Sequence, residues 1–491
     1  MALAKELLNL LDYYLDTDTI TCIVTDAEKC EQFRAKVTEI RLDDTTRPAI
    51  GENSQVWQTM TSTIHKLRTT KVSSTAEQVR LNAVIRTIMS LVMNLLAGGE
   101  AVQNQAMIYT KSELFDTLDD KRIIDNGLAL YCVRALVNLG AANDHLKDKL
   151  WPDFLSRFSS ESIDRICNSF DHDGYAAFLI FVVGFLGTSE ERTSSFMKCD
   201  TGRSIYLRFI ANVDSWMEHT GDQNFDLMYA ITQALIRYGY FPDLFILCRD
   251  PTESPSETQL VLLKLLDGYL SSPKTVTVIS PVTAINDIEL SQLLYKDAFM
   301  EISKPLSVQV MTKKIENSSS ERIAAFALVV MECLTCLSTL SQDVKNLLVE
   351  LGCVTEFLDL LKRADELIPR KTLKTKQDSE QSSSKCYEFP NLKRQIVELL
   401  SYLVEGNKQV QDQIRTSGGL PVILSQCNID DNNPYIREYA ILLIKGLLAE
   451  NTENQEFVAS LEAREAVSSD ALHEAGYETS IIDGKVSLRR R

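Results

Sequence analysis

The sequence offers few residues with the types and spacing that chemistry needs. Cys333 and Cys336 have the spacing of a redox or metal-binding pair. A tetrahedral metal site needs further ligands, and no second cysteine pair or nearby histidine supplies them. A redox pair favours a helix N-terminus, where the thiolate is stabilised, whereas these cysteines lie inside the apolar stretch from Ala324 to Leu340. We therefore interpret them as buried packing residues.

Other signatures of catalysis are missing from the sequence. The five histidines show no paired ligand spacing, and the sequence contains no glycine-rich phosphate loop, no G-x-S-x-G turn and no H-E-x-x-H helix. The sequence accordingly predicts a protein that is not an enzyme and that has no cofactor and no metal site.

The most distinctive polar segment runs from Cys427 to Glu438, and two interpretations of it remain open. In the first, Asn433 caps a helix that begins at Pro434, and the preceding aspartates favour the positive end of that helix. In the second, the loop contacts a protein partner, which would be basic. The candidate contact residues are Asp430, Asp431, Asn432, Asn433, Tyr435, Arg437 and Glu438.

The bulk composition restricts the class of partner. With 51 basic and 68 acidic residues the chain has a net charge of −17, which disfavours nucleic acid and membrane surfaces as partners. Eleven scattered cysteines are typical of reduced thiols in a cytosolic or nuclear protein. The longest uncharged apolar run, Tyr175 to Gly187, is shorter than the roughly 20 residues of a membrane span. We expect a buried helix there.

The elements that must position these residues are helices in a repeating order. Five segments share a leucine near the end of an apolar helix, followed eight residues later by a polar residue. Two of the leucine intervals are 44 residues, which lies within the roughly 40–47 residues of HEAT and armadillo repeats. The sequence predicts an all-α, armadillo/HEAT-like α-solenoid superhelix. The pairs are Leu95 with Gln103, Leu139 with Lys147, Leu337 with Lys345, Leu403 with Gln411, and Leu447 with Gln455.

Asparagines at two of these positions raise the question of peptide binding. Armadillo proteins that bind extended peptides carry a ladder of asparagines on successive repeats. Asn94 and Asn138 precede the first two leucines, but Cys336, Tyr402 and Gly446 stand at the equivalent positions of the others. The ladder is incomplete, and we interpret the two asparagines as polar residues near helix ends.

Irregular spacing and composition divide the chain. Leu337 and Leu403 are 66 residues apart, one period plus about 22, and the polar segment 363–388 accounts for the excess as a flexible insertion. Asp483-Gly484 lies between two β-prone runs and predicts a hairpin, with a disordered tail as the alternative. The predicted parts are an N-terminal helical cap (1–75), repeats (76–362), the insertion (363–388), C-terminal repeats (389–463) and a helix or hairpin tail (464–491).

About 70 residues, from Phe389 to Leu461, resemble the ataxin-10 family domain. The resemblance is carried by Leu399-Leu-Ser-Tyr-Leu403, by the loop from Cys427 to Glu438, and by Asn451-Thr-Glu-Asn-Gln455. It implies an armadillo-like, cytoplasmic, non-catalytic protein of a family associated with cytokinesis and, in animals, with neuronal survival. Some yeast relatives carry a name that refers to copper transport, but no clustered methionine, cysteine or histidine ligands support copper binding here.

These observations favour a scaffold or adaptor that binds protein partners through its repeat surface. A dedicated chaperone or assembly factor for one client is the first alternative, and a copper-related carrier is the second.

Overall fold

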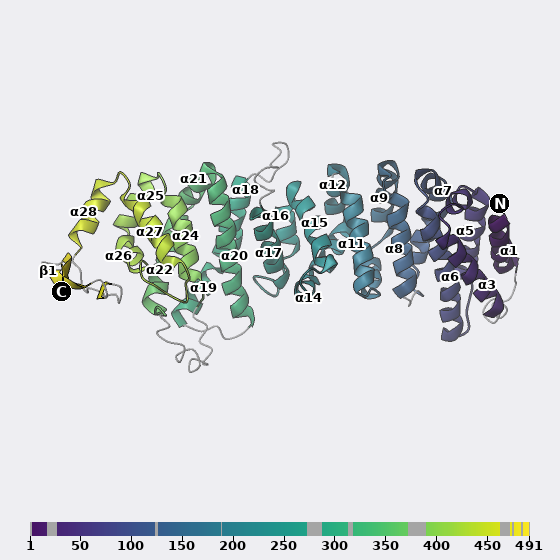
Figure 1. The fold of residues 1–491 in the computed structure, drawn as a ribbon, viewed down its shortest axis with the longest axis horizontal. Coiled ribbons are helices and arrows are strands. Elements are labelled where there is room, and N and C mark those ends of the chain that lie inside the picture. Colours follow the sequence, from purple (N-terminus) through teal and green to yellow (C-terminus); the bar gives the residue numbers. More distant parts are fainter. Residues whose placement is uncertain are drawn as a thin grey trace. The chain divides into compact units, whose positions relative to one another are not determined.

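The computed structural model describes residues 2–16, 27–122, 126–187, 189–272, 287–312, 318–371, 389–461, 472–473, 476–482 and 485–490. The described residues form two compact units, which meet in sequence between Arg249 and Asp250. Figure 1 labels most of the elements of both units.

Unit 1 is entirely helical in its described residues. Its core is a series of long apolar helices, each packed on the next: α6 on α8, α8 on α11, and α11 on α15. We call these the ladder helices of unit 1. The helices are α1 (Ala2–Asp16), α3 (Ala27–Leu42), α4 (Arg47–Gly51), α5 (Ser54–Thr69), α6 (Thr75–Leu96), α7 (Glu100–Leu118), α8 (Asn126–Gly140), α9 (Asp144–Arg157), α10 (Ser160–Asn168), α11 (His172–Leu186), α12 (Glu190–Lys198), α13 (Asp200–Ile210), α14 (Val213–Met217), α15 (Gln223–Arg237) and α16 (Phe241–Leu247).

Unit 2 has its own ladder helices, in which α17 packs on α20, α20 on α24, and α24 on α27. Shorter helices join and cover them, and a two-stranded sheet ends the chain. The elements are α17 (Glu257–Leu270), α18 (Asp287–Gln292), the π-helix η1 (Leu293–Phe299), α19 (Met300–Thr312), α20 (Ser318–Leu340), α21 (Gln342–Glu350), α22 (Cys353–Leu367), α24 (Leu392–Val404), α25 (Lys408–Thr416), α26 (Gly419–Ser425), α27 (Ile436–Leu448), α28 (Thr452–Ser460), β1 (Tyr477–Ile482) and β2 (Lys485–Arg490).

The leucines of the predicted repeats are all core residues at the ends of ladder helices. Each has no exposed surface: Leu95 in α6, Leu139 in α8, Leu337 in α20, Leu403 in α24 and Leu447 in α27. The prediction of an all-α repeat fold is therefore confirmed, because within each unit the interval between these leucines is the interval between successive ladder helices.

Two of the polar residues that follow these leucines, Gln411 and Gln103, have a shared structural role. Gln411 Nε2 donates to the carbonyl oxygens of Gly446 (2.8 Å) and Ala449 (3.2 Å), and its Oε1 accepts from Asn451 Nδ2 (3.0 Å). It thus satisfies the last carbonyls of α27, which have no partner within that helix, and holds the asparagine that caps α28. We call this arrangement the glutamine lock.

Unit 1 contains the same lock at the same sequence separations. Gln103 Nε2 donates to the carbonyl oxygens of Asn138 (2.9 Å) and Ala141 (3.0 Å), and Asn143 Nδ2 donates to Gln103 Oε1 (3.3 Å). Asn143 in turn caps α9. The repeat signal in the sequence therefore records a hydrogen-bond network as well as a hydrophobic period.

The hairpin predicted at the C-terminus is confirmed. β1 and β2 pair antiparallel from Tyr477 with Arg490 to Ile482 with Lys485. Asp483 and Gly484, on which the prediction rested, lie outside the described residues.

The predicted insertion 363–388 begins too early. Helix α22 continues to Leu367, with Ala364 buried, and Ile368 is also buried. These residues continue the apolar stripe of α22, which the low-complexity sequence after them obscures. Residues 372–388 lie outside the described residues.

Two helices, α6 and α20, are long and apolar enough to cross a membrane by length and composition alone. In the fold, 61% and 56% of their most apolar windows are buried inside the protein. Both are ladder helices with neighbours on two sides, so their apolar composition is that of core helices. The shorter run from Tyr175 to Gly187 lies in α11, where it is largely buried as expected.

Candidate functional site

The loop between α26 and α27 contains most of the predicted contact residues, and Asp430 lies at its buried centre. Its carboxylate forms an ion pair with Lys393 Nζ at 3.1 Å, and each side chain is 1% exposed. It also accepts hydrogen bonds from the amide nitrogens of Lys371 (3.1 Å) and Asn432 (3.1 Å) and from Asn433 Nδ2 (2.9 Å). Asp430 is thus an internal anchor that joins the loop to α24 and to the segment after α22.

Electrostatics at Asp430 favour the ionised carboxylate. Burial raises the pKa of Asp430, but the hydrogen bond from the Lys371 amide and the hydrogen bond and charge of Lys393 outweigh it, so the pKa lies below its usual value. Lys393 Nζ also donates to the carbonyl oxygen of Ile368 at 3.2 Å. Because this charge is enclosed and neutralised, we remove Asp430 from the set of partner contacts.

Asn433 caps a helix, but not the one that the sequence indicated. Its Oδ1 accepts a hydrogen bond from the amide nitrogen of Arg394 (3.1 Å), in the first turn of α24. The residue before α24, Asn391, makes no side-chain cap. Helix α27 begins at Ile436 rather than Pro434, after Tyr435 in a left-handed conformation (φ 65°). The predicted cap at Asn433 is therefore wrong in its target, because the loop folds back onto α24.

The remaining loop residues form the exposed rim of a shallow pocket of about 300 Å³. Tyr435 is 73% exposed and Ile429 is 57% exposed. Arg437 and Glu438 are exposed side chains that pair with each other at 3.1 Å. Asp431 is exposed, and its amide nitrogen donates to the carbonyl oxygen of Lys371 (2.8 Å). Asn432 is half-buried, and its carbonyl oxygen accepts from the Asn391 amide (2.9 Å).

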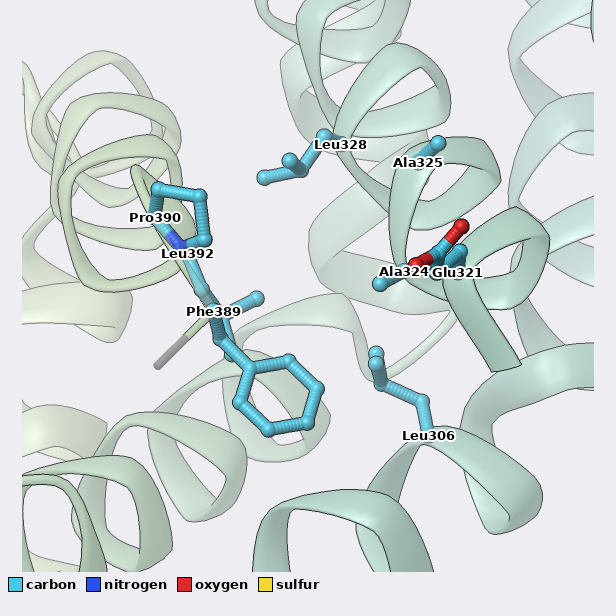
Figure 2. Close-up of a pocket in the computed structure, with 8 residues that line it drawn as sticks. All are labelled: Leu306, Glu321, Ala324, Ala325, Leu328, Phe389, Pro390 and Leu392. Carbon is cyan, nitrogen blue, oxygen red and sulfur yellow. The ribbon is translucent and has the colours of Figure 1, made fainter. Parts of the chain in front are cut away.

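An apolar groove lies where α19, α20 and the start of α24 meet, with a volume of about 310 Å³. Figure 2 shows Pro390 on one wall, facing Ala325 and Leu328 on the other, with the Phe389 ring toward the base near Leu306. Sequence reasoning missed this site, although a stripe of small and apolar residues at helical spacing on α20 was a usable signal. The lining residues are Leu306, Glu321, Ala324, Ala325, Leu328, Phe389, Pro390 and Leu392.

A second groove of about 310 Å³ lies between α24 and α27. Tyr402 and Glu405 line it from α24, and Tyr439 and Leu442 line it from α27, with Leu442 54% exposed. The two helices approach closely at Gly446, where an added Cβ would lie 2.6 Å from Val404 Cγ1. A side chain for an asparagine ladder therefore does not fit at that position.

The comparisons with known proteins agree on this part of the chain. Residues 392–489 match the family described as the spinocerebellar ataxia type 10 protein domain. This part of the chain is therefore similar to the ataxin-10 family domain. An ataxin-10 homolog of Debaryomyces hansenii is 40% identical over 192 residues, which are 39% of this chain and 38% of that protein.

Other ataxin-10 relatives match over shorter stretches. The ataxin-10 homolog of Saccharomyces cerevisiae is 50% identical over 101 residues, 20% of this chain and 18% of that protein. Ataxin-10 of Xenopus tropicalis is 34% identical over 97 residues, 20% of each chain. The matched stretches thus span well under half the length of these relatives. Among solved structures, an engineered protein is similar with a TM-score of 0.37 at 13% identity, over 91% of this chain and 99% of that one.

The cysteine pair lies on α20, outside the matched ataxin-10 domain. Cys333 has no exposed surface, and burial raises the pKa of its thiol well above the usual value. Burial also raises the pKa of Cys336, which is half-buried and contacts the carbonyl oxygen of Leu270. Neither thiol is thus an activated nucleophile. The described residues include no group of three or more histidine, cysteine and acidic side chains placed to hold a metal ion.

Asn94 and Asn138, the two asparagines considered for peptide binding, form hydrogen bonds within unit 1. Asn94 Nδ2 donates to the carbonyl oxygen of Ser90 (2.7 Å) in its own helix. Asn138 Nδ2 donates to the carbonyl oxygen of Met93 (2.9 Å) and so joins α8 to α6. Their amide groups serve the framework, in line with the interpretation as polar residues near helix ends.

Proposed function

We propose that this chain is a non-catalytic scaffold that binds protein partners through the surface of its helical repeats. The observation that carries the proposal is the contrast within the loop before α27. Asp430 and Asn433 fix the loop rigidly from inside, while Tyr435 stays 73% exposed in a left-handed conformation. A rigid backbone that presents an exposed aromatic side chain is a typical protein contact.

The exposed contact set is therefore Asp431, Tyr435, Arg437 and Glu438. Similarity to the ataxin-10 family domain supports a binding role and a part in cytokinesis. We extend the proposal to the cytoplasm, because no cysteine among the described residues forms a disulfide.

Affinity purification of the tagged full chain with quantitative mass spectrometry tests the proposal. The double variant Tyr435→Asn/Glu438→Lys removes the aromatic ring and reverses one charge, and asparagine tolerates the left-handed backbone. Glu456→Lys, an exposed reversal on α28, is the matched control. We expect the double variant to lose specific partners that the control retains. Equal recovery of all proteins by both variants would remove this loop as the binding surface.

A further inference from the structure

The apolar groove of unit 2 has a buried floor and accessible walls. Leu306, Phe389 and Leu392 form the floor and are 0%, 3% and 2% exposed. Ala325 and Leu328 remain half-buried on the α20 wall. Figure 2 shows the two walls separated along the groove, with Leu306 at its base. Apolar side chains from another molecule would therefore lose water against this surface, which is the main source of affinity in such sites.

Carboxylates stand at both ends of the same stripe on α20. Residues 321, 325, 328 and 332 follow helical spacing and share one face. Glu321 is exposed, and Glu332, one turn beyond Leu328, is 40% exposed. The Glu332 carboxylate receives Gln395 Nε2 at 2.5 Å and lies 3.8 Å from Arg394, a guanidinium that also pairs with Glu398 at 2.9 Å. Arg394 thus pairs with two carboxylates, Glu332 and Glu398, and cannot neutralise both. The groups around the groove therefore carry a net negative charge.

We propose that this groove binds an amphipathic helix of a partner protein, with apolar side chains between α20 and α24 and lysine or arginine side chains against Glu321 and Glu332. The inference rests on the proposed binding function and adds a second surface to it, with the chemistry of the partner that this surface would bind. The charge pattern and the chain's net charge of −17 select a basic segment.

The shape of the site selects a helix over other recognition modes. The stripe from Glu321 to Leu328 covers about two helical turns, roughly 10 Å. Its lining residues come from helices and their ends and include no strand edge to which a strand could be added. Among the described residues that line the groove, Phe389 alone is aromatic, whereas polyproline recognition uses grooves lined by several aromatic side chains.

The test uses two fluorescein-labelled peptides of about 18 residues, long enough to form helix on binding. Both carry leucine at positions i, i+3, i+4 and i+7; one has lysine and the other has glutamate on the polar face. Fluorescence anisotropy measures binding to the full chain and to two groove variants, Ala325→Phe and Glu321→Lys. Ala176→Phe is the matched control, because Ala176 is a half-buried wall residue of a groove in unit 1.

We expect saturable binding of the lysine peptide and none of the glutamate peptide. Ala325→Phe should weaken binding about tenfold or more, because the phenyl ring occupies the space of one buried leucine. Glu321→Lys should also weaken it, more at low salt than at high salt, and Ala176→Phe should leave it unchanged. Equal binding of both peptides, no saturable binding, or an equal loss in the control would overturn the proposal. Such a result would leave the affinity-purification test of Tyr435 unaffected. The groove proposal can therefore fail while the proposed scaffold function stands.

Discussion

Replacing Asp430 by asparagine should destabilise unit 2 strongly, although the change is nearly isosteric. Asparagine keeps an acceptor for the amide nitrogens of Lys371 and Asn432 but removes the charge that faces Lys393, whose side chain is 1% exposed. Breaking a buried ion pair from one side costs about 3–5 kcal/mol, because the remaining charge is left without compensation. In Asp430→Asn the ammonium would keep the Ile368 carbonyl oxygen as a neutral acceptor.

The complementary variants separate the charge effect from packing. Lys393→Met should cost less, about 2–3 kcal/mol, because the Asp430 carboxylate keeps three N–H donors. The double variant Asp430→Asn/Lys393→Met removes both charges and should lie about 1 kcal/mol below wild type. The coupling free energy of the cycle is then about 4 kcal/mol or more.

Urea unfolding followed by far-UV circular dichroism measures these differences. All three tryptophans, Trp57, Trp151 and Trp216, lie in unit 1. Tryptophan fluorescence therefore reports unit 1 alone and serves as the internal control for changes made in unit 2. A cost below about 1 kcal/mol for Asp430→Asn, or a double variant less stable than both single variants, would refute the argument that Asp430 and Lys393 are a buried, coupled pair.

The pH dependence follows from the lowered pKa of Asp430. A carboxyl group whose pKa is lower in the folded state contributes stability that is fully present above its unfolded pKa of about 3.9, and that is lost as pH falls through the folded value. The stability difference between wild type and Asp430→Asn should therefore be constant above about pH 5 and shrink below pH 4. A difference that stays constant down to pH 3 would contradict the assignment.

Three further predictions concern the hydrogen bonds and buried residues that hold the helices of the two units together. Asn433→Ala should cost about 1 kcal/mol and speed hydrogen exchange at the Arg394 amide, because the cap of α24 is lost; unchanged exchange would argue against capping from the loop. Gln411→Leu should cost about 2–3 kcal/mol by urea unfolding, because two carbonyl oxygens and the Asn451 side-chain amide each lose one hydrogen bond, while the amide keeps its bond to Asp412. Gln103→Leu should cost a similar amount in unit 1, and a neutral result at both positions would rule out the glutamine lock. The Cys333 thiol should react with iodoacetamide only after unfolding, as judged by mass spectrometry, because it is fully buried with a raised pKa.

The spacing of apolar residues predicted burial correctly wherever a residue's burial depends only on which face of its helix it occupies. Leu403 and Leu447 are fully buried because their spacing places them on the face that meets the next ladder helix. The constant offset of eight residues from Leu403 to Gln411 was visible in the sequence. The role of Gln411 was not, because the carbonyl oxygens that it binds lie 35 and 38 residues further along the chain. The apolar groove was not predicted from the sequence for the same reason. Leu306 and Phe389 are far apart in sequence, and only the fold brings them to one groove.

The sequence by itself determined the class of protein: an acidic chain of apolar helices at a repeat interval of 44 residues, with a hairpin at its end. Tertiary structure alone decided which residues of the loop before α27 are exposed and can contact a partner. Asp430 and Tyr435 are five residues apart, yet one is buried and the other is 73% exposed. Local sequence favours a polar, exposed loop at both positions, but Lys393, 37 residues earlier, compensates the buried charge of Asp430. Burial of a charge depends on a partner that only the packed helices bring within reach.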